Sequence, residues 1–384
     1  MSKHRLNNVI GNFERRIRHR GPDTESDLSD TQTVVSDYKA TGYTKILFLF
    51  GFFMLFMVMG AIDLGVGSYS ISIIEVYEII AQKLCEIITG TNPGWVEDTI
   101  AVSVVWNQRL PRILVAVISG VGLAVAGAAM QSMLKNPLAD PYTTGISSGA
   151  AFGATIAITF GVFIIPGDIG IVVNAFIFGL IPAGIILMLS RFKKPSPAMM
   201  ILAGTSLMYI FNALQQFFML VADPNSSQQV LSWTTGSITS CTWNDIPIMA
   251  ILTIAGFFAI QYLTKTLNAM NSGDSYAKSL GVDVDRIRII TLLIISVLAA
   301  GIVSFTGIIG FVGLVAPHIA RLFIGSDNRF LVPASALMGS GLMLFADMVA
   351  HYVVNFDLPI GIVTAVIGGP VFLLLIMRQR KEVW

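Results

Sequence analysis

The most chemically distinctive stretch of this sequence is NSGDSYAKSLGVDVDRIR (271–288), a polar segment in a chain of which only 12% is charged. Its order predicts a short helix, because Ser272 or Asp274 can cap the start, Ala277 and Leu280 fall on one face, and Gly281 can end it. Asp283 then opens the next helix. Two readings stay open: an ordinary solvated loop, or a rigid helix-turn-helix that is held against a partner in water.

No other residues form a pattern typical of catalysis. The chain lacks a phosphate-binding G-x-x-x-x-G-K-[ST] loop, a G-x-S-x-G elbow and an H-E-x-x-H motif, and its four histidines are dispersed. The two cysteines, Cys85 and Cys241, are too few and too far apart for a metal cluster. With a net charge of +1 and no basic stripe, nucleic-acid binding is also disfavoured. We therefore predict no catalytic residue, no metal ligand and no cofactor bound by this chain.

The hydrophobic fraction of 54% is too high for a soluble domain and indicates a protein of the lipid bilayer. Apolar runs close to the ~20 residues that cross a bilayer recur about ten times. They are continuous and lack a period of two, so helices and not a barrel are expected. The predicted spans are 45–64, 111–133, 143–162, 169–189, 198–221, 246–263, 287–305, 310–323, 331–353 and 359–377.

Lysine and arginine fix the expected orientation. With a cytoplasmic amino terminus and ten crossings, the outer loops hold only Lys83, Arg109 and Arg112 of the 24 basic residues. Both termini are then cytoplasmic. Cys85 and Cys241 both fall on the outer side, which leaves a disulfide between them open. Residues 1–44 lack apolar periodicity and predict a disordered cytoplasmic tail, and residues 45–384 form the transmembrane domain.

Small residues predict where helices pack closely. Gly145, Gly149 and Gly153 recur at a spacing of four, which would place them on one face of a helix that another backbone can approach.

Several motifs together resemble one known family. The stretches are RLPRIL (109–114), GAAMQSMLKNPLADPYTTGISSGA (127–150), SLGVDVDRIR (279–288), GIIGFVGLVAPHIARL (307–322) and LPIGIVTAVIGGPVFLL (358–374). In this order they resemble the FecCD family, the membrane permease subunits of ABC importers for iron-siderophores, haem and cobalamin. The resemblance spans about Lys45 to Met377 and implies an all-α fold of the type II ABC importer permease.

The resemblance also implies partners. In this family the loop between the sixth and seventh helices couples the permease to a separate ATPase, a role that would fall here on Asp274, Ser275, Ala277, Lys278, Leu280 and Gly281. It implies a homodimer in the cell membrane with two ATPase subunits, which use ATP and Mg²⁺, and an extracellular binding protein. The expected cargo is a metal chelate, first an iron(III)-siderophore, otherwise cobalamin or haem. An ion-coupled secondary transporter is the alternative from another class, which the scarcity of Asp and Glu inside the spans disfavours.

Two further groups of residues match family positions. Arg109 and Arg112 resemble the arginines that dock the binding protein, and His351 stands where a third arginine is common, which suggests docking that depends on pH. Pro317, His318 and Arg321 match a signature at the cytoplasmic end of the eighth span, where Pro317 should break the helix. Their role is either structural, or in gating or contact with the ATPase.

Overall fold

The protein is described from a computed structural model, which defines residues 24–65, 69, 71–167, 169–352 and 358–378. The chain divides into two units, residues 1–48 and residues 49–384, and each is described by itself.

Helices account for the regular structure of the described residues, which contain no strand. Short irregular helices precede two of the long ones: a π-helix, η1 (Val104–Arg109), leads into α5, and a 3₁₀ turn, η2 (Pro141–Thr144), leads into α6. The α-helices are α2 (Thr24–Gly65), α3 (Ile73–Thr89), α4 (Thr99–Ser103), α5 (Leu110–Leu134), α6 (Ile146–Phe160), α7 (Gly170–Ser190), α8 (Pro197–Val221), α9 (Pro224–Thr234), α10 (Ile246–Asn271), α11 (Asp274–Ser279), α12 (Val284–Thr306), α13 (Val312–Ile324), α14 (Asn328–Tyr352) and α15 (Ile360–Arg378).

Each of the ten predicted spans corresponds to a helix, which confirms the all-α polytopic fold. In the described part of the chain, seven helices are long and apolar enough to cross a bilayer. The other three, α6, α13 and α15, are apolar but shorter. Helix α6 starts later than predicted because Pro141 and the positive φ of Gly145 (+85°) hold the preceding residues in a tighter turn.

The structure differs from the sequence-based boundaries at two places. Helix α2 begins at Thr24, so residue 44 is not an element boundary. Of the predicted disordered tail, residues 1–23 lie outside the described residues, and residues 24–44 belong to α2. Extending an existing helix needs no new nucleus, which lets the polar residues before the apolar run join it. The stretch between the first two spans, treated as an outer loop, contains α3, whose interleaved charges lower its hydropathy.

Helix α5 lies at the centre of residues 49–384 and packs against α10, α12, α13 and α14. Glycines make the closest approaches. A Cβ at Gly120 would lie 2.5 Å from the carbonyl oxygen of Gly339 in α14, and one at Gly127 would lie 1.8 Å from that of Gly313 in α13. Two backbones therefore touch α5 where only glycine fits.

The predicted glycine face of α6 has two members, not three. A Cβ at Gly149 would lie 2.4 Å from the Phe178 carbonyl oxygen, and one at Gly153 would lie 2.5 Å from that of Asn174, so both face α7. Gly145 precedes the helix and faces Gly204 of α8 instead. The spacing of four predicted a single face for all three, but the positive φ of Gly145 takes it out of the helical periodicity.

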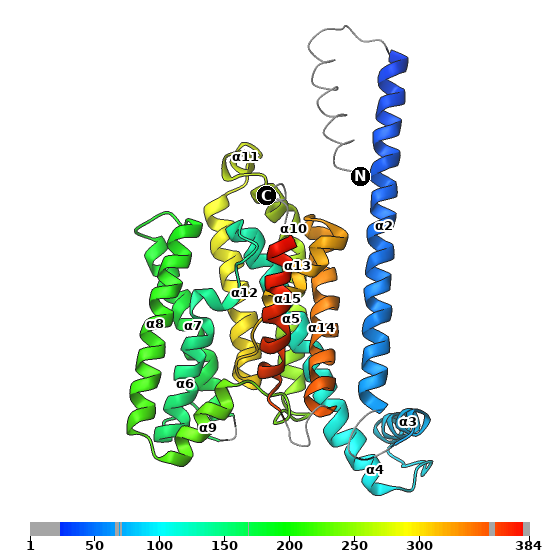
Figure 1. Cartoon of the computed structure of the whole chain (residues 1–384), viewed down its shortest axis with the longest axis vertical. Coiled ribbons are helices and arrows are strands. Elements are labelled where there is room, and N and C mark those ends of the chain that lie inside the picture. Colours follow the sequence, from blue (N-terminus) through cyan, green and yellow to red (C-terminus); the bar gives the residue numbers. More distant parts are fainter. Residues whose placement is uncertain (1–23, 66–68, 70, 168, 353–357, 379–384) are drawn as a thin grey trace. The chain divides into compact units, whose positions relative to one another are not determined.

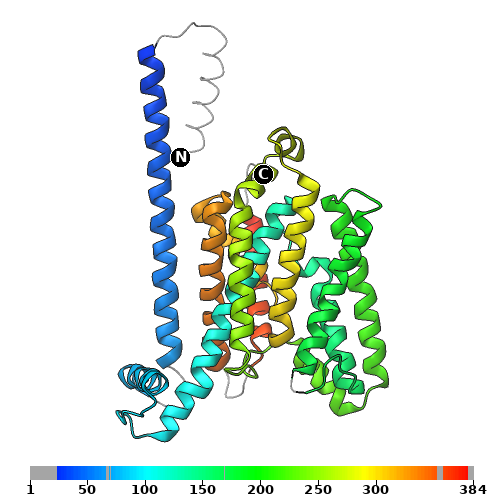
Figure 2. The ribbon, with the colours of Figure 1, turned by 180° about the vertical axis from the view of Figure 1, so that it is seen from behind.

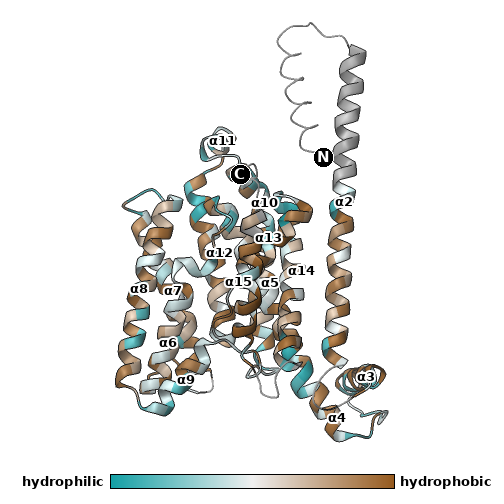
Figure 3. Cartoon of the chain, viewed as in Figure 1, coloured by the Kyte–Doolittle hydropathy of each residue, from teal (hydrophilic) through white to brown (hydrophobic). Residues whose placement is uncertain are grey.

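The two ends of the helices differ in what they carry. Within residues 49–384, α11 lies at one end, and α3, α4 and α9 lie at the other (Figures 1 and 2). Hydrophobic residues dominate along the long helices, and hydrophilic residues gather at the ends and in the loops (Figure 3). We call these the α11 end and the α3 end.

Candidate coupling site and outer pocket

Two glycines shape the polar segment between α10 and α12. Gly273, with φ of +126°, turns the chain out of α10, and Gly281, with φ of +81°, turns it out of α11. At this second turn the Gly281 N–H donates to the Lys278 carbonyl (3.0 Å) and the Val282 N–H donates to the Ala277 carbonyl (3.0 Å). These two bonds form a Schellman motif, which satisfies the last carbonyls of a very short helix. The predicted ending of α11 at Gly281 is confirmed.

The start of α11 differs from the prediction. Gly273 is the N-cap residue without a side-chain bond, and Ser272 instead ends α10. Asp274 lies in the first turn of α11, and its carboxylate points to cations on other elements. The capping prediction is wrong because Gly273 takes the N-cap position, which leaves the Asp274 carboxylate to bind cations on other elements. Asp283, by contrast, caps α12 as predicted and accepts from the Arg286 N–H at 3.1 Å.

One side of α11 packs on the protein and the other is open. Ala277 is fully buried with Met270 and Val284, whereas Tyr276 and Leu280 are exposed. The prediction that Ala277 and Leu280 lie on one face of the helix is wrong, because Leu280 has already left the helix at its C-cap. Ser275, Lys278 and Gly281 are also exposed. An exposed aromatic and aliphatic pair at the tip of a polar loop is a surface that a partner protein can bind.

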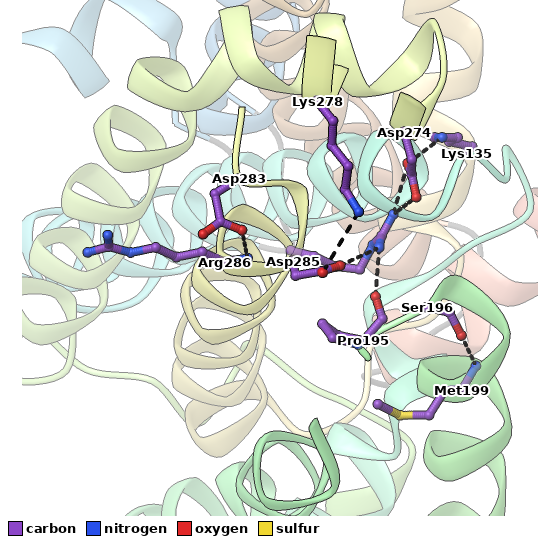
Figure 4. Close-up of polar contacts among 10 residues, drawn as sticks. Lys135, Pro195, Ser196, Met199, Asp274, Lys278, Asp283, Asp285 and Arg286 are labelled. Atoms are coloured by element: carbon purple, nitrogen blue, oxygen red, sulfur yellow. Dashed lines mark hydrogen bonds and ion pairs between the residues drawn. The ribbon is translucent and has the colours of Figure 1, made fainter. Parts of the chain in front are cut away.

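An ion-pair network ties α11 to three other elements. The Asp274 carboxylate accepts from Nζ of Lys135 (2.5 Å), just after α5, and from Nη2 of Arg288 (3.1 and 3.2 Å), in α12. Nη1 of Arg288 donates to the Pro195 carbonyl (2.6 Å), next to the residue that caps α8. Figure 4 draws these contacts as dashed lines: that of Lys135 ends on Asp274, and that of Pro195 ends on the unlabelled guanidinium, which is Arg288. These contacts therefore link α11 to the ends of α5 and α12 and, through Arg288, to the start of α8.

Burial makes this network specific. The Arg288 side chain is 2% exposed, so its guanidinium has lost its water and depends on the carboxylate and carbonyl that it contacts. Burial raises the pKa of Asp274, but bonds from Lys135 and Arg288 outweigh it and bring that pKa below its usual value. Asp274 is therefore ionised at neutral pH. Asp285, which approaches Arg288 and Lys278 only to 3.9 and 4.0 Å, is a weak additional partner.

Sequence reasoning missed Lys135 and Pro195 as contacts of the Asp274–Arg288 network, because their partners lie far away in the sequence. Lys135 ends α5 with a positive φ of +52°, an uncommon conformation for a residue with a side chain. Its position in KNPLADP, a basic residue between two apolar helices, is the one signal that could have indicated it.

Helix α13 continues through Pro317, so the prediction that this proline breaks the helix is wrong. Pro317 cannot donate to the Gly313 carbonyl four residues earlier, and that carbonyl faces Gly127 of α5. The missing bond thus allows the close crossing of the two helices. His318 is buried with its ring edge-on to Phe372, and Arg321 lies in the last turn. A role in gating or ATPase contact stays a prediction.

At the α3 end, a pocket of about 660 Å³ brings together charged residues from three helices. Its lining includes Asp63 of α2, Arg109 and Arg112 before and within α5, and Asp347 and His351 of α14. We call it the outer pocket, after the orientation that the sequence predicts. The three predicted docking residues, Arg109, Arg112 and His351, thus line one pocket. Their positions in the sequence could not show that His351 lies beside the two arginines.

Both arginines of the outer pocket already have internal partners. Arg109 is buried and donates to the carbonyls of Leu64 (3.0 Å) and Tyr69 (2.5 Å), which satisfies the open end of α2. Arg112 forms an ion pair with Asp347, with its Nε and Nη2 each 2.7 Å from Oδ1. Its Nη1 donates to Nδ1 of His351 at 3.3 Å. The docking role of these residues stays a prediction, and the buried Asp347 is a partner that sequence reasoning missed.

Comparison with known proteins agrees with this architecture. The model of the FecCD transport family matches residues 55–378. The chain belongs to the FecCD family. Its relatives include the molybdate import system permease protein MolB of Haemophilus influenzae, 31% identical over 88% of this chain and 97% of the relative. They also include the hemin transport system permease protein HmuU of Yersinia pestis, 37% identical over 72% of this chain and 84% of the relative.

A solved structure of a metal-chelate type ABC transporter in an inward-facing conformation has the same fold. It is 29% identical, with a TM-score of 0.75 over 86% of this chain and 99% of that one. This FecCD chain is therefore a permease subunit of an ABC importer and not an enzyme, and it works with ATPase subunits and a binding protein. The FecCD relatives carry different cargo names, so family membership leaves the cargo open.

Proposed function

We propose that this chain forms the translocation pathway of an ATP-driven importer for an iron(III)-siderophore-type metal chelate. It pairs with a second copy in the cell membrane, above two ATPase subunits that use ATP and Mg²⁺, and receives its cargo from an extracellular binding protein. Both termini are cytoplasmic, since the α11 end carries most of the basic residues. The hemin relative and the metal-chelate transporter structure support this class of cargo. Cobalamin or haem is the alternative.

The observation that carries the proposal is the attachment of α11. Asp274 joins α11 to α5 and α12 through two charged contacts, while Tyr276 and Leu280 stay exposed for the ATPase. Closure of the ATPase dimer would pull α11 and, through Lys135, displace α5. Helix α5 spans 25 residues, or about 37 Å. Its first turn carries Arg112 of the outer pocket, and Lys135 follows its last residue. The coupling site and the outer pocket are thus connected by one continuous helix.

The experiment is uptake into proteoliposomes that hold this chain with its ATPase and binding protein. Wild type is compared with a variant in which residues 274–281 are a Gly/Ser linker of equal length, using labelled ferric chelate, cobalamin, haem and molybdate separately. We expect ATP-dependent uptake of the ferric chelate by wild type and its loss in the linker variant, which should still bind the outer protein.

The remaining outcomes separate cargo from mechanism. ATP-dependent uptake of another cargo would show that the ferric chelate is not the substrate, but it would leave the role proposed for the coupling site unchanged. Uptake without ATP that follows a proton or sodium gradient would refute the importer mechanism. Uptake that persists in the linker variant would refute the role of α11.

A further inference from the structure

Helix α3 differs in direction from the helices that cross the bilayer. In two views related by a half turn, α3 is seen nearly end-on, whereas α5, α8, α12 and α14 run along the vertical (Figures 1 and 2). It lies at the α3 end of residues 49–384, beside η1, and shares a buried cluster with Ala101 of α4. A helix that crosses the direction of the spans at one of their ends lies roughly in the plane of the membrane surface.

One face of α3 is packed on the protein. Val76 and Ile79 are buried against Ala101 and Val105 of α4 and η1. Gln82 fastens the same face, because its Oε1 accepts from the Val96 N–H at 2.8 Å. The helix is therefore a fixed part of the permease, and its orientation about its own axis is set by these contacts.

The other face of α3 is apolar and uncovered. Its exposed side chains recur at helical spacing and form one stripe; they are Ile73, Ile74, Tyr77, Leu84, Ile87 and Ile88. Ile74 is 74% exposed and Ile88 is 81% exposed. The charged residues of α3 lie off this stripe: Glu75, Glu78, Lys83 and Glu86. Water would be a poor environment for so wide an apolar face.

We propose that α3 is an interfacial helix whose stripe is embedded among the lipids of the leaflet at the α3 end, at the boundary of headgroups and acyl chains. Three observations favour lipid over a protein partner. The helix runs across the direction of the spanning helices at one of their ends, the stripe carries no charged residue, and aromatic side chains typical of the membrane interface are exposed on it and beside it, at Tyr77 and Trp95. A binding protein that docks and leaves in each cycle would repeatedly return the stripe to water.

The chemistry of the flanking residues specifies the lipid. Glu78, Glu97 and Asp98 are exposed near the stripe, and Lys83 is paired with Glu86 at 2.8 Å. Carboxylates at this surface repel anionic headgroups, so we expect α3 to contact zwitterionic or neutral lipids in preference to anionic ones. Because α3 packs on η1, which carries Arg109, the lipid surface would hold one wall of the outer pocket in place.

Spin-label accessibility tests this proposal in the full-length chain reconstituted in phosphatidylcholine vesicles. In a Cys85→Ser background, Ile74→Cys and Ile88→Cys place a nitroxide on the stripe. Glu78→Cys labels the polar side of α3, and Ile251→Cys labels an exposed apolar position of α10. All four positions face outward, so the fold should persist, and size-exclusion chromatography checks it.

We expect the labels at 74 and 88 to collide more with oxygen than with a nickel chelate, as at 251, and the label at 78 to show the reverse. Labels at 74 and 88 that collide more with the nickel chelate than with oxygen would place the stripe in water and overturn the proposal. Protection of 74 and 88 from both agents would show that protein covers the stripe, which would also overturn it.

Discussion

Replacing Asp274 with asparagine tests the coupling site most directly. The change keeps the shape of the side chain but removes the charge that Lys135 and Arg288 contact at 2.5 and 3.1 Å. Hydrogen bonds to charged groups contribute about 1.5–3 kcal/mol each. The Asp274 side chain is 39% exposed, so solvent screens part of this energy, and we expect a total loss of about 1–3 kcal/mol.

A loss of this size lowers the equilibrium constant between held and released α11 by roughly 5- to 150-fold. We expect Asp274→Asn to lower ATP-driven uptake at least about fivefold, at the lower end of that range. The hydrolysis rate of the ATPase alone should not change. Uptake and hydrolysis are measured in the same proteoliposomes, so that uncoupling is separated from a failure of assembly.

Asp285→Asn is the matched control. It makes the same chemical change 11 residues away in the chain, but Asp285 reaches its cations only at 3.9 and 4.0 Å. Uptake should stay near that of wild type. If the two variants behave alike, or if Asp274→Asn transports normally, the network does not couple α11 to the spanning helices.

The dependence on pH has a definite sign. The pKa of folded Asp274 is lowered from its usual 3.8, so the contribution of its ion pairs is complete above that value and is lost as pH falls below it toward the lowered pKa. We therefore expect the difference between wild type and Asp274→Asn to stay constant from pH 7 to pH 5. A difference that fades within that interval would mean that another group controls the site.

Three further predictions concern other parts of the chain. Gly127→Ala should abolish recovery of folded protein, because its Cβ would lie 1.8 Å from the Gly313 oxygen. Gly184→Ala is the control: open space surrounds Gly184, so this variant should elute as wild type in size-exclusion chromatography. Asp347→Asn should lower the free energy of unfolding by about 3–5 kcal/mol, because it leaves the largely buried Arg112 without its carboxylate. Lys83→Gln, which removes a surface ion pair, should lower it by less than about 1 kcal/mol. Thermal unfolding in detergent measures both. Cys85 should react with a maleimide at pH 8 in the native protein, and Cys241 should not until the protein is denatured, since burial raises the pKa of its thiol to about 12. Equal labelling of both thiols would contradict the burial of Cys241.

Much of the fold follows from local sequence. Ten apolar runs predicted ten helices, because a backbone in hydrocarbon must satisfy its hydrogen bonds within the segment. The end of α11 at Gly281 and the cap of α12 at Asp283 were also predictable, since each depends on a residue type at one position. The resemblance of the motifs indicated the family, and the comparison over residues 55–378 confirms it.

Contacts between distant segments were not predictable in the same way. Asp274 was expected to cap its own helix, but it binds Lys135, 139 residues away, and Arg112 was expected to face outward, but it binds Asp347, 235 residues away. Pro317 was expected to break α13, but a carbonyl without its usual donor let α13 cross α5 at Gly127 instead.

The sequence by itself determined the membrane class, the ten apolar helices and the polar segment that a partner can bind, because hydropathy, caps and turns act over a few residues. The tertiary structure alone decided which charges meet. An ion pair depends on the positions of two side chains to within about 1 Å, and those positions follow from how α5, α12 and α14 pack together. The same packing brought the three separate predicted docking residues together in the lining of one outer pocket, beside the carboxylates of Asp63 and Asp347.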